Sequence, residues 1–159
     1  MNKHLMAIVR RLLVTLLAVL AACSGDPDNP EQQIHEMISA GEEAMETRSI
    51  MTVLEFIASD YQDKQGRKKK DIQRLVAGYI LRNKSIHLLT RVHDIALNED
   101  KTQAGVVLYV GMAGVPVTSA DQLMLTRADL YRFDLSMILE EGDWRVASGS
   151  WRQARLQDF

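Results

Sequence analysis

The sequence predicts an α+β domain in which three helices precede an antiparallel sheet of about four strands. Up to Ile80, apolar residues recur at intervals of three and four, which is the spacing of an amphipathic helix. From Ser85 onwards they alternate with polar residues, which is the spacing of a half-buried strand. Near the end, Glu141-Gly142-Asp143 separates two alternating segments and predicts a tight hairpin. Helices that precede hairpin-linked strands are expected to pack on one face of the sheet.

The first helix has a clear start in the sequence. Asn29 is a good N-cap, Pro30 suits the first helical position, and Gln32 stands where a capping box places its second residue. The apolar spacing then predicts a helix that ends near Arg48. Ser49 is the expected cap of a second, shorter helix.

The third helix is expected to start near Asp71, because Ile72 and Leu75 begin an apolar face there. A polar loop, residues 59–66, separates it from the second helix. The basic run 67–70 is interpreted as the solvated start of the third helix, and contact with anionic headgroups is the alternative.

Four segments are expected to form the sheet. They are residues 86–93, 104–112, 131–137 and 144–151. The second of them is apolar on both faces and is therefore predicted to be a central strand. Residues 111–125 form a long insertion with few charges before the third strand.

The first residues have the organisation of an export signal. Lys3, Arg10 and Arg11 precede an uncharged run, residues 12–22, which is about half of the ~20 apolar residues that a membrane-spanning helix needs. This length predicts a secretory signal and not a membrane span. The chain is thus expected to comprise a signal peptide at 1–22, a lipidated cysteine and tether at 23–29, and a folded domain at 30–159.

The lipid expectation comes from Leu20-Ala21-Ala22-Cys23, which resembles the lipobox of bacterial lipoproteins. The resemblance implies that Cys23 carries a diacylglycerol, that the chain is cut before it, and that its new amine is often acylated. Cys23 is the only cysteine and has no disulfide partner, and a soluble exported protein is the alternative. Ser24 follows where inner-membrane lipoproteins often carry Asp. The resemblance therefore implies an anchor in the outer membrane, with the domain facing the periplasm.

The charge balance argues against a nucleic-acid partner. The whole chain has a formal charge of −2, and loss of Lys3, Arg10 and Arg11 with the signal takes it to −5. A mildly acidic domain is poorly suited to hold nucleic acid through its overall field. The histidines after the signal show no ligand-like spacing, so neither a metal nor a cofactor is expected.

The C-terminal part of the chain carries a resemblance to a known fold. Residues 130–135 (Leu-Tyr-Arg-Phe-Asp-Leu) and 141–146 (Glu-Gly-Asp-Trp-Arg-Val) are similar to the long paired strands that close nuclear transport factor 2-like domains. The helix order agrees, and the resemblance covers residues 30–152. It implies the cone-shaped fold of SnoaL-like cyclases and ketosteroid isomerases. Tyr61-x-Asp63 and Gly66 add a similarity to envelope lipoproteins.

For the enzymes of this fold, the resemblance implies acid–base residues that project from the sheet into an apolar pocket. The candidates are Asp134, His87 and His93, together with Tyr109 and Tyr131. Alternation places the carboxylate and both imidazoles on the outer face of the sheet, opposite the apolar residues of their strands. We therefore expect a non-catalytic domain, and a cofactor-independent isomerase or hydrolase is the alternative. The outer face is expected to be solvated or to dock a partner, homodimerisation included.

The expected function is the binding of a small apolar ligand or of an envelope protein. The pocket is predicted from inward-facing apolar and aromatic residues: Val53, Ile57, Tyr79, Tyr131, Phe133 and Leu135. The insertion is expected to cover the pocket mouth or to meet a partner through Val115, Val117, Leu123 and Met124. The alternative is that these insertion side chains fold back into the core.

Overall fold

Helices and one sheet make up the folded part of the chain. The computed structural model describes residues 29–126 and 128–158, so the predicted signal peptide and Cys23 lie outside the described residues. The chain divides into two units, Met1–Gln33 and Ile34–Phe159, and the packing below is that of the second unit. The elements are α2 (Pro30–Glu46), α3 (Ile50–Glu55), α4 (Lys69–Arg82), β1 (His87–Leu97), β2 (Gln103–Ala113), α5 (Ala120–Leu125), β3 (Asp129–Glu140), β4 (Asp143–Gln153) and a 3₁₀ turn (Leu156–Asp158).

The ends of α2 follow from local chemistry. The backbone N–H of Gln32 donates to Oδ1 of Asn29 at 3.2 Å, so the predicted N-cap is confirmed. After the helix, Arg48 has a φ of 62°, the left-handed conformation that commonly ends a helix. Its guanidinium donates to the carbonyl oxygen of Ile80 at 2.9 Å and also to that of Asn83. Arg48 therefore ends α2 and caps the C-terminus of α4.

The start of α4 lies two residues before the predicted one. The helix begins at Lys69, and the carboxylate of Asp71 accepts a hydrogen bond from the backbone N–H of Lys68 at 3.0 Å. A carboxylate in the first turn satisfies a free N–H and interacts favourably with the helix dipole. Asp71 thus stabilises the helix start from within the first turn.

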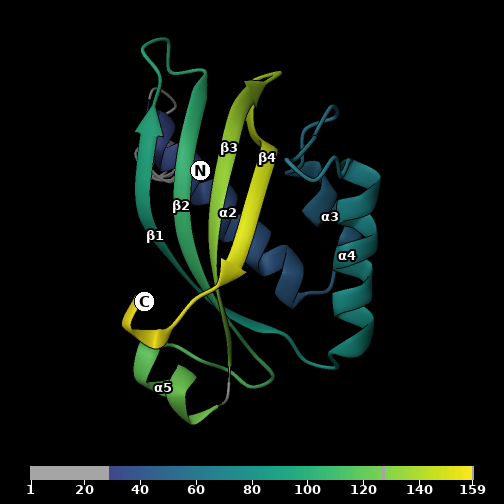
Figure 1. Cartoon of the computed structure of the whole chain (residues 1–159), viewed down its shortest axis with the longest axis vertical. Helices are drawn as coiled ribbons and strands as arrows, with labels where there is room; N and C mark the ends of the chain where they lie inside the picture. Colours follow the sequence, from purple (N-terminus) through teal and green to yellow (C-terminus); the bar gives the residue numbers. More distant parts are fainter. Residues whose placement is uncertain (1–28, 127, 159) are drawn as a thin grey trace, which may run out of the picture. The chain divides into compact units, whose positions relative to one another are not determined.

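The four strands form one antiparallel sheet in the order β1-β2-β3-β4, so each pairs with the next along the chain (Figure 1). The register shifts once in β1 at His93 and once in β4 at Ala147. Such a bulge reverses the alternation of side chains beyond it. In β4, Trp144 faces the helices before the bulge, and Trp151 faces them after it, opposite Phe133.

The turn between β3 and β4 is the tight hairpin that the sequence predicts. Glu140 pairs with Asp143, and both residues between them have positive φ angles, 56° for Glu141 and 91° for Gly142. These angles are those of a type I′ turn, whose twist matches that of the strands. Gly142 adopts its angle without strain. Glu141 has a Cβ, so its positive φ destabilises the turn by about 1 kcal/mol.

The main core lies between the sheet and the helices that cover one of its faces (Figure 1). Most of its buried members come from α2, α4 and the four strands, and Tyr61 and Ile86 come from the segments between them. The buried members include Ile34, Ile80, Ile86, Leu88, Val106, Leu108, Val110, Met137, Trp144 and Val146. The inward side chains of β1 and β2 follow the predicted alternation up to the bulge in β1.

Both edges of the sheet are partly occupied by groups of the chain itself. On β4, Val146 forms a parallel bridge with Ile57, and its carbonyl accepts a hydrogen bond from the N–H of Ala58 at 3.0 Å. On β1, the N–H of Leu88 donates to Oε1 of Glu46 at 2.8 Å. The segment after α3 therefore extends the sheet beside β4.

The insertion after β2 folds onto the outer face of the sheet, at one end. It forms α5 and a second, smaller apolar cluster, which comprises Ala113, Val117 and Leu123 packed against Leu89, Ala128 and Leu130. Gly111 leaves room for this packing, because a Cβ there would lie 2.6 Å from the side chain of Leu123. The insertion is thus anchored to the sheet.

Candidate functional site

A cleft of about 370 Å³ lies between α2, α4 and the helix-facing side of the sheet. Its walls are mostly apolar and aromatic. The residues that line it are Met45, Ile72, Leu75, Val76, Tyr79, Arg82, Met112, Tyr131, Phe133 and Trp151. A cleft of this size and composition is typical of sites for small ligands.

One face of α4 supplies the longest wall of the cleft. Ile72, Val76 and Tyr79 follow helical spacing, and the lining continues to Arg82. At about 1.5 Å per residue, this wall is about 15 Å long. Leu75 stands at its border and is 46% exposed, so the cleft opens to solvent along this side.

The opposite wall is aromatic. The ring centroids of Tyr131 and Phe133 lie 6.3 Å apart, and those of Phe133 and Trp151 lie 6.2 Å apart. Trp151 also carries the guanidinium of Arg67 over its ring, with Cζ 4.0 Å from the ring centroid. This is the geometry of a cation–π contact. Trp151 is thus contacted by Phe133 of β3 on one side and by Arg67, which precedes α4, on the other.

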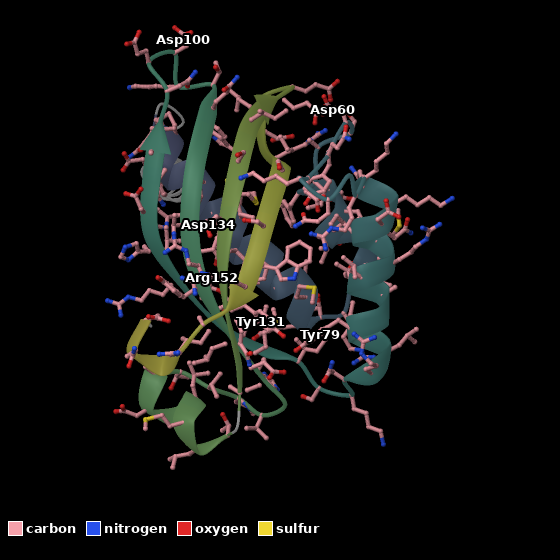
Figure 2. All side chains as sticks on the ribbon, in the orientation of Figure 1. Asp60, Tyr79, Asp100, Tyr131, Asp134 and Arg152 are labelled. Atoms are coloured by element: carbon pink, nitrogen blue, oxygen red, sulfur yellow. The ribbon has the colours of Figure 1, made fainter. Side chains whose placement is uncertain are left out.

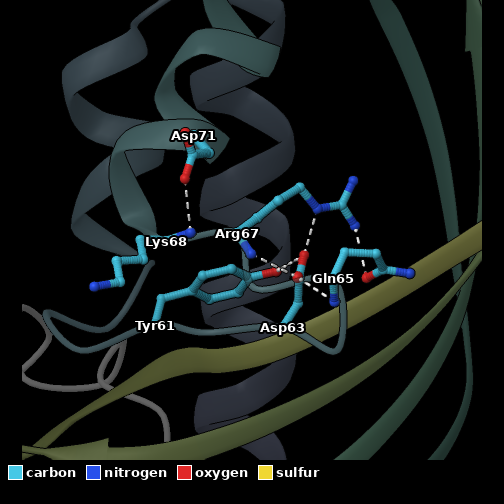
Figure 3. A network of polar contacts seen from close by, with 6 residues as sticks. All are labelled: Tyr61, Asp63, Gln65, Arg67, Lys68 and Asp71. Carbon is cyan, nitrogen blue, oxygen red and sulfur yellow. Dashed lines mark hydrogen bonds and ion pairs between the residues drawn. The ribbon is translucent and has the colours of Figure 1, made fainter.

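Arg67 is itself held by Asp63, whose side chain is fully buried (Figure 3). Nε of Arg67 lies 2.5 Å from Oδ2 of Asp63, while the N–H groups of Gln65 and Arg67 donate to Oδ1 at 2.9 and 3.0 Å. Burial acts to raise the pKa of Asp63, but the hydrogen bonds from Arg67 and Gln65 outweigh it and lower that pKa below its usual value. Asp63 therefore stays ionised and organises the turn that positions Arg67.

Two tyrosines supply hydroxyl groups beside the apolar walls. Tyr79 and Tyr131 lie between α4 and the sheet (Figure 2). Burial is the main cause that raises the pKa of Tyr79 above its usual value of 10.0, and the nearby carboxylate of Asp129 adds to this effect. Tyr79 is therefore neutral at physiological pH and can donate a hydrogen bond. Neither hydroxyl is hydrogen-bonded to another residue in the described part of the chain.

The structure gathers three of the six predicted pocket residues at the cleft. Tyr79, Tyr131 and Phe133 line it. Leu135 faces the same side but packs toward Gly149, and Ile57 lies in the segment that pairs with β4. Val53, on α3, does not line the cleft either. Their assignment to a ligand site stays a prediction.

The predicted acid–base candidates lie elsewhere. Oδ1 of Asp134 is 2.6 Å from Nη2 of Arg132, and the hydrogen bonds from Arg132 hold the pKa of Asp134 below its usual value. Nε2 of His87 lies 3.0 Å from Oγ of Ser85. His93 makes an edge-on contact with Tyr109, at 5.8 Å between ring centroids. These groups lie on the outer face, as alternation predicts, and none of them lines the cleft.

The predicted partner residues of the insertion separate into two pairs. Val117 and Leu123 are buried in the second apolar cluster, so they are not part of an exposed partner surface. The reason is that α5 lies on the outer face of the sheet and buries its own apolar side. Val115 and Met124 are exposed, at 48% and 64%. None of these four residues lines the cleft, although Met112, at the start of the insertion, does. Their role as a pocket cover stays a prediction.

Sequence reasoning missed several residues of the site. Met45, Arg82, Met112 and Trp151 line the cleft but were not among the predicted pocket residues. Alternation within β2 could have indicated Met112, which shares the parity of Val110. No local signal marks Met45, because its neighbours in the cleft are distant in sequence.

Among residues 29–126 and 128–158, no group of three or more His, Cys, Asp or Glu side chains is placed to hold a metal ion. None of the described helices is long and apolar enough to cross a membrane.

Comparison with known proteins identifies the fold. No protein-family model and no curated protein sequence matches the chain. A candidate dehydratase of the NTF2-like family from Streptomyces avermitilis matches with a TM-score of 0.61 and 16% identity, over 80% of this chain and 99% of that one. A candidate scytalone dehydratase from Novosphingobium aromaticivorans matches with a TM-score of 0.61 and 10% identity, over 79% and 84%.

Bd1075 from Bdellovibrio bacteriovorus is similar as well, with a TM-score of 0.58 and 10% identity. The alignment covers 77% of this chain but only 41% of Bd1075. At such identities the likeness concerns the fold alone. Together with the α+β order and the four-stranded antiparallel sheet, these matches establish that the chain has the nuclear transport factor 2-like fold.

Proposed function

We propose that this protein is a lipid-anchored protein of the bacterial envelope whose domain binds a small apolar ligand in the cleft between α4 and the sheet. The binding role is supported by the walls of the cleft. The anchor is supported by the lipobox-like end of the predicted signal, at Cys23. The two parts of the proposal are tested separately.

The composition of the walls carries the binding role. Among the described residues that line the cleft, Arg82 is the only charged one, and none is Asp, Glu or His. An unpaired carboxylate in an apolar cavity has a desolvation cost that catalytic sites exploit and that a binding pocket does not need. Apolar walls with the hydroxyls of Tyr79 and Tyr131 suit an apolar guest that hydrogen bonds orient. The methionines add side chains that adapt their shape to a guest.

The binding role is tested with an apolar fluorescent dye, N-phenyl-1-naphthylamine, whose emission rises when it leaves water. Val76→Phe fills the cleft and is expected to weaken dye binding about 10-fold or more, equivalent to about 1.4 kcal/mol. Leu81→Phe is the matched control, because Leu81 is on the same helix but is 82% exposed and outside the cleft. Ile72→Phe is a second filling variant, in case Val76→Phe does not fold. Equal dye affinity in the filled and control proteins would contradict the binding role.

The anchor is tested by metabolic labelling with a fatty acid in a bacterial host. Cys23→Ser is expected to abolish the label, because no other thiol is present to accept the lipid. Ser24→Asp is the matched control for labelling: it is expected to keep the label and to move the protein from the outer to the inner membrane fraction. A label that persists on the Cys23→Ser protein would contradict the anchor.

A further inference from the structure

The four residues of the basic run, 67–70, fall into two pairs with different surroundings. Arg67 is bound to Asp63, and Nζ of Lys69 donates to the carbonyl oxygen of Ile57 at 2.6 Å. The side chains of Arg67 and Lys69 therefore bind other groups of the domain. The ammonium groups of Lys68 and Lys70 form no hydrogen bond or ion pair with another described residue. Figure 3 shows the Lys68 side chain directed away from the Asp63 network.

All three lysines line one groove of about 730 Å³ between α3, the polar loop and the first turn of α4. We call it the lysine groove. Asp60 is the carboxylate among its lining residues, so three positive charges face one negative charge. Leu54 and Tyr61, both buried, form its apolar side. The groove is therefore a concave surface with an excess of positive charge.

The backbone around the lysine groove is fixed by the fold. The N–H of Gln62 donates to the carbonyl oxygen of Ala147 at 3.1 Å, and Gln62 forms an isolated antiparallel bridge with Lys68. Tyr61 is 3% exposed, and its hydroxyl lies 3.5 Å from Asp63. The lysines thus extend from an ordered frame, so binding needs little further ordering of the chain.

The charge of the lysine groove contrasts with that of the whole chain. The chain carries −2 in total and −5 without Lys3, Arg10 and Arg11. An anionic surface would therefore repel the domain as a whole but attract it at this groove. Lysine ammonium groups are compact donors that commonly bind phosphate oxygens.

We propose that the lysine groove binds the phosphate groups of anionic lipid headgroups on the membrane that carries the protein. The choice of a membrane rests on the lipid anchor proposed above. The tether, residues 24–29, reaches about 20 Å when fully extended at about 3.3–3.6 Å per residue. So short a tether keeps the domain close to the bilayer surface. The lysines can therefore approach to within about 8 Å of the headgroups, the distance over which physiological salt screens the attraction between charges. Headgroup binding turns the lysine groove toward the membrane. It thereby fixes how the cleft between α4 and the sheet is oriented relative to the bilayer.

The test uses the chain from residue 23 with Cys23→Ser, so that no lipid contributes to binding. Cosedimentation is measured with neutral phosphatidylcholine vesicles and with vesicles that contain about one third phosphatidylglycerol, an anionic lipid. Binding to the anionic vesicles only is expected, and it should weaken as salt is added. Lys68→Gln with Lys70→Gln should weaken vesicle binding about 25-fold, from about 5-fold per lysine near the surface.

Lys84→Gln with Lys101→Gln is the matched control, because it removes the same charge at exposed positions outside the groove. It is expected to change vesicle binding about 2-fold at most, through the overall field alone. Equal effects of the two double variants would overturn the proposal. If the groove double variant does not fold, Lys70→Gln alone is used, with an expected loss of about 5-fold.

Inorganic phosphate distinguishes a membrane from a soluble phosphate ligand. Saturable phosphate binding that depends on Lys68 and Lys70, without binding to anionic vesicles, would overturn the membrane as the occupant. Failure of the anchor is seen separately, as loss of fatty-acid label on wild-type Cys23. Vesicle binding by the unlipidated chain would then still support the headgroup-binding groove.

Discussion

Gly111→Ala should destabilise the domain, because the new methyl group would collide with Leu123. A Cβ at this position would lie 2.6 Å from Cδ2 and 2.7 Å from Cδ1 of Leu123. Leu123 is 2% exposed and cannot move away without opening the second apolar cluster. Overpacking of a tight site typically costs about 1–3 kcal/mol, and we expect about 2 kcal/mol here.

Gly105→Ala is the matched control for this substitution. Gly105 lies on the same strand and the same face as Gly111, and a Cβ there would have no neighbour within 4 Å. Without a collision, alanine should raise the free energy of unfolding by about 0.5 kcal/mol, through a lower entropy of the unfolded chain. The two substitutions should therefore change the free energy of unfolding in opposite directions.

A double variant isolates the collision from other effects of alanine. Leu123→Ala alone should cost about 2–5 kcal/mol, but it also removes the atoms that meet the new methyl group. Gly111→Ala added to Leu123→Ala should then cost about 2 kcal/mol less than it does in the wild type.

Urea unfolding followed by circular dichroism gives these values, provided that the slopes of the transitions agree. A loss of about 2 kcal/mol is easily measured against a typical total of about 5–15 kcal/mol. Equal stability of the Gly111→Ala and Gly105→Ala proteins would refute the packing of α5 on the outer face. Strict additivity in the double variant would do the same.

Three further predictions concern turns and caps. Glu141→Asn should stabilise the hairpin by about 1 kcal/mol, because Asn tolerates positive φ better, and a thermal melt measures it. Arg48→Met should cost about 1–2 kcal/mol in urea unfolding, because the last carbonyls of α4 lose a charged donor; Arg82→Met, in the last turn of the same helix, is the control. Asp63→Asn should lower the urea midpoint at neutral pH. The folded-state pKa of Asp63 lies below the usual 3.8, so its stabilisation is present above that value and is lost as the pH falls through the folded pKa. Variant and wild type should therefore converge in acid.

A different result would contradict each of these three predictions. A lower melting temperature for Glu141→Asn would mean that the Glu side chain stabilises the hairpin more than its backbone strains it. Equal losses for Arg48→Met and Arg82→Met would show that helix capping is not the cause. If the difference in urea midpoint between Asp63→Asn and wild type persisted unchanged in acid, the ionised carboxylate would be excluded as its cause.

Local signals in the sequence predicted the elements well. The Asn29 cap depends on residues within three positions, and the hairpin depends on Glu141 and Gly142 alone, so both could be identified from short stretches. Alternation placed His87 and Asp134 on the outer face correctly, because no bulge separates them from the apolar residues used as a reference. The fold class followed from the order of these elements.

The candidate site was harder to predict because two of its determinants are not local. Counted from Trp144 by simple alternation, Trp151 would face outward, but the bulge at Ala147 turns it into the cleft. The sequence pattern predicts that Arg67 is part of a solvated helix start, whereas it stacks on Trp151 from a loop more than eighty residues away in sequence. A bulge and a long-range stacking contact leave no periodic trace in the sequence.

The occupied edges of the sheet bear on how copies of this protein behave when they are crowded together. An open strand edge with free N–H and C=O groups is a template for pairing with another chain, and natural sheets protect such edges against aggregation. Here the segment at Ile57 and Ala58 occupies part of the β4 edge, while the carboxylate of Glu46 binds an N–H of β1. The bulge at His93 further distorts the β1 edge. Edge-to-edge polymerisation is therefore disfavoured at both edges of the sheet, by groups from the helical half of the domain and by the bulge in β1.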